Sequence, residues 1–270
     1  MMRAGGRFRS IAMALLALCA SAPALAGAFN PPAGEGVAIL SGSFTDGRDF
    51  FDGAGRKWRA PGYRKFESQV HLEFGLTDWL AAIARPRFVS IREDGRKGFD
   101  GSGLGAGEFG AQARLLQFSQ WVFAAQALAR TPASPGGRFR DWEDGGGVEG
   151  RLLAARSFTL FGAPGYLDMQ IGARTRKGRA DEIVSEQTLG LRPFPRLLAT
   201  FQTFTQHALE SARRRIARGA PVGAWRMKIQ IGVVYDVTAK WSLGVGVFRT
   251  LAVRDGARES GATVSLWRKL

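Results

Sequence analysis

The sequence has 270 residues, of which 45% are hydrophobic and 23% are charged, with 36 glycines, one cysteine and a formal net charge of +15. Glycines scattered through every candidate segment argue against long helices, because glycine destabilises a helix interior. A single cysteine excludes a disulfide framework, so stability must come from packing or from a membrane.

Residues 1–26 have the pattern of a secretory signal peptide. Three arginines precede an apolar run from Ile11 to Ala20, and the small-residue ending Ala24-Leu25-Ala26 is typical of a cleavage site. We therefore expect cleavage before Gly27, which leaves residues 27–270 as the mature chain.

A lipoprotein signal in which Cys19 is lipidated is the alternative, but Leu18 precedes that cysteine where a small residue is usual. No later segment supplies the ~18 consecutive apolar residues that a spanning helix needs. Removal of the three signal arginines lowers the formal charge from +15 to +12. An exported basic protein suits a bilayer surface, so we expect the lipid bilayer and lipopolysaccharide as partners, and no nucleic acid.

Polar and apolar residues alternate along the mature chain. Between Lys65 and Phe74 every second residue is polar and each intervening residue, apart from Ser68, is apolar. This period of two predicts a strand with one wet and one apolar face. The same pattern returns within residues 108–115, 167–174 and 226–236.

The alternation and the turn residues predict twelve strands, at 36–45, 63–75, 79–91, 103–116, 121–130, 148–156, 161–175, 182–192, 196–206, 223–236, 241–251 and 260–270. Brief turns are predicted near 76–78, 117–120, 157–160, 193–196 and 237–240. Longer loops rich in Gly, Arg and Asp are predicted at 46–62, 92–102, 131–147, 176–181, 208–222 and 252–259. Short turns at one rim and long loops at the other are typical of outer-membrane barrels.

Aromatic residues follow the brief turns at regular spacing. Trp79, Trp121, Phe161 and Trp241 each open a predicted strand, at steps of 42, 40 and 80 residues. A unit of about 40 residues divides the 244 residues that remain after the signal into about six strand pairs. We predict that these four residues are membrane-interface anchors, because an amphipathic ring favours the lipid–water boundary. The alternative is that they are core residues of a soluble protein.

The predicted fold is therefore all-β: a transmembrane antiparallel up-and-down β-barrel of about twelve strands, spanning residues 27–270, in a bacterial outer membrane. A soluble β-sandwich would also alternate, but it would not need charges on the hidden face of nearly every strand. In a barrel these charges face the lumen, and closure leaves no unpaired edge in the hydrocarbon.

Short motifs resemble one bacterial family. They are Pro32-Ala33-Gly34-Glu35-Gly36, Lys65-Phe66-Glu67, Phe74-Gly75-Leu76-Thr77-Asp78-Trp79 and the ending Leu266-Trp267-Arg268-Lys269-Leu270. With these the sequence is similar to the outer-membrane β-barrel family associated with the MetA-pathway of phenol degradation, whose members are described as transporters. The resemblance implies a barrel with a transport role.

The predicted lumen carries charges of both signs. The residues expected to line it are Lys65, Glu67, His71, Glu73, Arg85, Arg87, Glu108, Gln112, Arg114, Glu149, Arg151, Asp168, Arg174, Glu186, Arg226 and Lys228. One interpretation is a narrow passive channel or transporter for small polar, anionic or aromatic solutes. The other is a structural or surface-interaction barrel whose lumen is plugged by cross-strand ion pairs, with arginine suited to both roles.

An enzyme is a third alternative, because outer-membrane lipid-modifying enzymes use a histidine with a serine. The chain has His71 and His207, but the sequence pairs neither with a serine and an acid in a pattern typical of a catalytic triad. We therefore predict no catalytic residues and no enzymatic activity. We also predict no metal and no cofactor. Residues 105–110 match a dinucleotide fingerprint in pattern only, because no helix follows them.

A basic run, Arg213-Arg214-Arg215-Ile216-Ala217-Arg218, lies in a predicted outer loop, where one interpretation is attraction to the phosphates of lipopolysaccharide and the other is a merely solvated loop.

Overall fold

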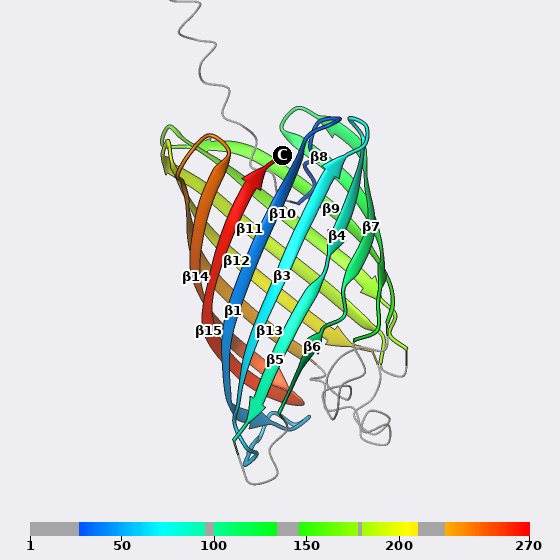
Figure 1. The fold of residues 1–270 in the computed structure, drawn as a ribbon, viewed down its shortest axis with the longest axis vertical. Coiled ribbons are helices and arrows are strands. Elements are labelled where there is room, and N and C mark those ends of the chain that lie inside the picture. The colour runs from blue at the N-terminus through cyan, green and yellow to red at the C-terminus, as the bar shows by residue number, and fades with distance from the viewer. Residues whose placement is uncertain (1–26, 95–99, 134–145, 178–179, 210–224) are drawn as a thin grey trace, which may run out of the picture.

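The computed structural model describes residues 27–94, 100–133, 146–177, 180–209 and 225–270, and their strands form one antiparallel sheet that closes on itself (Figure 1). The predicted signal peptide and the predicted basic run lie outside the described residues. The strands are β1 (Gly36–Phe51), β2 (Lys57–Trp58), β3 (Tyr63–Gly75), β4 (Leu80–Arg85), β5 (Arg87–Glu93), β6 (Gly101–Leu104), β7 (Glu108–Phe118), β8 (Trp121–Arg130), β9 (Gly147–Leu160), β10 (Ala163–Arg174), β11 (Glu182–Phe194), β12 (Leu197–Ala208), β13 (Trp225–Asp236), β14 (Trp241–Arg254) and β15 (Gly256–Lys269).

The fifteen strands occupy twelve positions in the wall, as the sequence predicts. β4 and β5 both pair with β3 and together fill one strand position. β7 pairs with β4 and β6 pairs with β5, so β6 and β7 together fill the next position. The two-residue strand β2 pairs with the end of β1 and adds no position. β1 pairs with β3 on one side and with β15 on the other, which closes the barrel. Closure pairs the backbone groups that would otherwise face hydrocarbon unsatisfied.

Pro86 separates β4 from β5. Proline has no backbone N–H to donate, but its carbonyl still accepts the N–H of Val70 across the barrel wall. The facing segment Gly105-Ala106-Gly107 likewise separates β6 from β7, and the N–H of Gly105 donates to the carbonyl of Arg87. The apparent dinucleotide fingerprint therefore marks an irregularity in a barrel wall.

Short turns and long connections lie at opposite rims. The chain reverses within residues 76–79, 119–120, 161–162, 195–196 and 237–240 at the rim that also holds the C-terminus, at the top of Figure 1. We call this the short-turn rim, and the opposite one the long-loop rim.

The polarity of the wall is the reverse of that of a soluble protein. Phe44, Ile171 and Val245 are more than half exposed on the outside, whereas Glu149 and Asp168 are each 2% exposed on the inside. An exposed apolar surface over alternate positions of the strands suits lipid contact. Among the described residues, no helix is long and apolar enough to cross a membrane.

Three predicted boundaries are wrong. β9 continues to Leu160, so Phe161 lies in the turn with φ of 50° and not at the opening of a strand. The predicted loop at 252–259 is almost entirely strand, because β14 and β15 are joined at Asp255 alone. β1 also extends six residues beyond its predicted end, to Phe51, and pairs with this added part of β15.

Candidate functional site

Ion pairs within and between strands line the lumen. Alternation on each strand turns the charged side chains inward, and antiparallel pairing sets carboxylates opposite guanidinium and ammonium groups. The structure brings these predicted residues together in salt bridges: Lys65 with Glu67, Arg87 with Glu67, Arg85 with Glu108, Arg151 with Glu149 and Glu186, Arg174 with Glu149 and Glu108. His71 Nε2 lies 3.4 Å from Glu73 Oε2.

Glu259 is the centre of the group nearest the long-loop rim. Its side chain is 3% exposed, and it accepts a hydrogen bond from the hydroxyl of Tyr63 at 2.5 Å. Lys228 approaches it at 3.0 Å, Arg226 at 3.5 Å and Lys65 at 3.8 Å. One buried carboxylate thus offsets part of the charge of three cations.

A second group runs across β7 to β11. Glu149, whose side chain is fully buried, accepts hydrogen bonds from Arg151 and, at 2.5 Å, from Arg174. Arg174 also approaches Glu182 at 3.6 Å, and Glu182 is bonded to Arg176 at 3.0 Å. Each of these two buried carboxylates thus has two arginines within salt-bridge distance.

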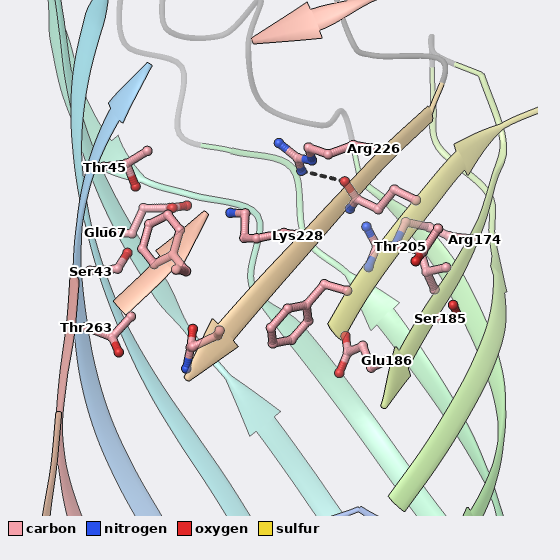
Figure 2. A pocket seen from close by; sticks show the side chains of 15 residues that line it. Ser43, Thr45, Glu67, Arg174, Ser185, Glu186, Thr205, Arg226, Lys228 and Thr263 are labelled. Atoms are coloured by element: carbon pink, nitrogen blue, oxygen red, sulfur yellow. Dashed lines mark hydrogen bonds between the residues drawn. The ribbon is translucent and has the colours of Figure 1, made fainter. Parts of the chain in front are cut away.

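A cavity of about 250 Å³ lies in the lumen between these two groups. Fifteen residues line it (Figure 2), and its charged lining consists of Arg174, Arg226 and Lys228 with Glu67 and Glu186. Three cations against two carboxylates leave a formal surplus of one positive charge. The space is smaller than the ~300 Å³ that begins the range for drug-sized ligands, so it suits small solutes.

Aromatic and hydroxyl groups complete the lining of this cavity. Phe204 and Phe248 lie in it, and the ammonium of Lys228 stands 4.6 Å from the ring centroid of Phe248. Ser43, Thr45 and Thr205 add neutral groups that can donate or accept. The cavity therefore offers cations, ring faces and hydroxyls to one solute.

An irregular N-terminal segment, residues 27–32, enters the lumen at the short-turn rim. Ala28 is fully buried among Val122, Ala124 and their neighbours, and Phe29 packs against that cluster and against a second one that contains Tyr166. We call this stretch the inner segment. It narrows the lumen at the end opposite the long loops.

Polar contacts fix the inner segment in place. Gln112 donates to the carbonyl of Gly27 and to the side chain of Asn30, both at 2.8 Å. The N–H of Ala28 donates to Asp168 Oδ2 at 2.9 Å, and Asn30 donates to the carbonyl of Trp79 at 2.9 Å. Two predicted lumen residues thus hold a part of the chain itself.

Arg114 and Glu108, two more of the residues expected to line the lumen, have separate partners. Arg114 bonds Gln117 near the short-turn rim, and Glu108 is matched by Arg85, Arg130 and Arg174.

The predicted anchors all lie at the short-turn rim. Trp79 and Phe161 are the most exposed of the four, and Trp121 and Trp241 each have an arginine over the ring. Among the described residues there is no cluster of three potential metal ligands.

Sequence reasoning missed Glu259, Glu182, Arg176 and Tyr63. A signal for Glu259 exists in the alternation Glu259, Gly261, Thr263 and Ser265, which continues one step beyond the predicted start of that strand. The inner segment gave no periodic signal, because its partners are far away in the sequence, 140 residues in the case of Ala28 and Asp168.

Comparisons with known proteins concern the barrel as a whole. No protein-family model and no curated sequence matches the chain. Among solved structures, the COG4313 outer membrane channel from Pseudomonas putida F1 is similar over 90% of this chain and 98% of that chain, with a TM-score of 0.69 and 15% identity. The NanC porin is similar over 87% of this chain and 100% of that chain, with a TM-score of 0.52 and 9% identity.

This likeness establishes the fold. Each similarity extends over nearly the whole wall rather than over a few hairpins. The closed antiparallel barrel predicted from the sequence is confirmed.

Proposed function

We propose that the mature chain, residues 27–270 after removal of a signal peptide, is an outer-membrane channel or transporter for small polar, anionic or aromatic solutes. The observation that carries the proposal is the charged cavity inside a wall with an apolar exterior. The two similar structures are those of an outer membrane channel and a porin, which supports the same role. The proposal assigns no chemical reaction to the barrel.

The lining indicates how a solute would be selected. A carboxylate would be attracted by Arg226 and Lys228 across the cavity, while an aromatic ring would meet Phe204 and Phe248. The carboxylates of Glu67 and Glu186 moderate this attraction, so a bound anion can leave again. Conduction requires such weak binding.

The bilayer would meet the apolar exterior, with Trp79, Trp121, Phe161 and Trp241 near the boundary at the short-turn rim. Amphipathic aromatic rings gathered at one rim support a position of that rim near the lipid–water boundary, and short turns at a rim are typical of the periplasmic side. The long-loop rim would then meet lipopolysaccharide.

The density of ion pairs favours a second candidate, a structural or surface-interaction barrel whose lumen is closed. Arg151, Arg174 and Glu149 are nearly fully buried, and the inner segment narrows the short-turn rim. This candidate predicts a barrel that is stable in membranes and passes no solute.

Swelling of proteoliposomes distinguishes the two candidates. The refolded mature chain should admit benzoate faster than benzamide, which has similar size and no charge. The double variant Arg226→Gln with Lys228→Gln should lose this difference, because it removes two of the three cations from the cavity. Uptake of neither solute by liposomes that contain folded barrel would overturn the channel and favour the closed barrel.

A further inference from the structure

Asp168 is a buried carboxylate with few partners. It is 2% exposed, and its oxygens accept hydrogen bonds from the N–H of Ala28 at 2.9 Å and from the side chain of Gln170 at 2.8 Å. In the described part of the chain, no arginine, lysine or histidine forms a salt bridge with it. A buried charge is costly unless a counter-charge compensates it.

The surroundings of Asp168 are acidic. Glu73 and Glu186 are near enough to act on it electrostatically, and both add negative charge. Glu73 is itself 5% exposed, and its Oε1 has no hydrogen-bond partner among the described residues. Glu186 already pairs with Arg151, so the compensation that is lacking among the described residues concerns Asp168 and Glu73.

The backbone of Gly27 lies against the carboxylate of Asp168. A Cβ at this position would stand 1.7 Å from Asp168 Oδ2 and 2.0 Å from its Cγ, so any larger residue would displace the Asp168 carboxylate. Gly27 also has φ of 78°, a conformation that favours glycine. Since the nitrogen of Gly27 is one bond from its Cα, a charge on that nitrogen would be adjacent to the carboxylate.

We infer that Asp168 is the binding site for a primary ammonium, the free amino terminus that cleavage between Ala26 and Gly27 creates. The inference rests on the processing step of the proposed function, but not on conduction. Cleavage replaces a neutral amide with an ammonium, which supplies a counter-charge beside Asp168. The ion pair and the bonds from Gln112 then hold the inner segment across the lumen. Processing thus completes the narrowing of the short-turn rim.

The acylation rate of the α-amine tests this pairing, because only an uncharged amine reacts. Three chains are refolded: one that begins at Gly27, one with Gly-Ser added before Gly27, and the Asp168→Asn variant of the first. Each added residue moves the ammonium by up to ~3.5 Å, so the extension keeps the charge but displaces it from Asp168. Asp236→Asn is the matched control, since Asp236 lies at the same rim and already pairs with Arg192.

We expect the Gly27 amine to react about tenfold more slowly than that of the extended chain. This is the change in the uncharged fraction that a rise of about one unit in the pKa of the amine produces. Asp168→Asn should remove most of that protection, and Asp236→Asn should keep it. Equal rates for the Gly27 and extended chains in folded barrels would overturn the inference. The extension leaves the barrel sequence intact, so this comparison stands even if Asp168→Asn does not fold.

Two further readouts separate this inference from the proposed function. Mass spectrometry of the chain isolated from outer membranes should give a first residue of Gly27, and any other first residue would overturn the inference. A protected amine in a barrel that admits no solute would support the pairing while refuting the channel. An unprotected amine in a conducting barrel would refute the pairing while supporting the channel.

Discussion

Removal of the charge of Glu259 should destabilise the barrel more than any loss of an outward-facing pair. In Glu259→Gln, Lys65 keeps Glu67 and Arg226 keeps its bond to Gln206. Lys228 is left without an anionic partner among the described residues, while its contact with the ring of Phe248 remains. Breaking a buried pair costs about 3 to 5 kcal/mol, and the partial compensation here places the cost near the lower end.

A loss of about 3 kcal/mol corresponds to a fall in Tm of roughly 6 to 12 °C for a domain of this size. The assay is thermal unfolding of the refolded chain in detergent, followed by circular dichroism. Asp46→Asn removes the same charge from an exposed pair with Arg48 near the same rim, and it should lower Tm by less than about 4 °C. If Glu259→Gln melts no lower than Asp46→Asn, Glu259 does not hold the cluster together.

Gly110→Ala should fail to refold to a heat-resistant barrel, because its Cβ would stand 1.9 Å from the carbonyl oxygen of Ala127. Gly150→Ala is the control, since its Cβ would have nothing within 4 Å, and it should refold normally. The heat-modified shift of folded barrel on gels measures both. The loop that begins at Asp52 should loosen in acid. The backbone N–H of Arg56 holds the pKa of Asp52 below its ordinary value of 3.8, so the carboxylate stabilises the loop above that pH and the effect is lost as the pH falls through the lowered value. Hydrogen exchange at the Arg56 amide should accelerate at low pH beyond the intrinsic rate, and Asp52→Asn should abolish this difference.

The alternation of polar and apolar residues was sufficient to predict the wall. Lys65 to Phe74 forms β3 with its polar face inward, because a period of two has only one register that hides the charges from lipid. The spacing of Trp79, Trp121 and Trp241 gave the strand number, because each brief turn returns the chain to the same rim.

The polar composition of one segment led to a wrong prediction, because strands there continue beyond the apolar exterior of the barrel. Residues 252–259 contain Arg, Asp and Gly and were predicted as a loop, yet β14 and β15 extend through them because the long-loop ends of β1 and β15 pair with each other. Hydrogen bonding between strands sets these boundaries, and side-chain polarity does not report it.

The inner segment and the cavity could not be predicted from the sequence. Both depend on which residues meet across the lumen, and strands that face one another across a barrel share no local pattern. Gly27 shows this most clearly, since its contact with Asp168 joins an irregular segment to the middle of β10.

The central claim is that the lumen is a passage with a cationic selectivity region, and single-channel recording of the refolded mature chain tests it most directly. In a gradient of KCl across a planar bilayer, we predict discrete conductance steps with a reversal potential on the anion side. Deletion of residues 27–32 should enlarge the steps, since it removes the inner segment. A membrane that contains folded barrel and stays sealed at all voltages, both with and without residues 27–32, would contradict the account.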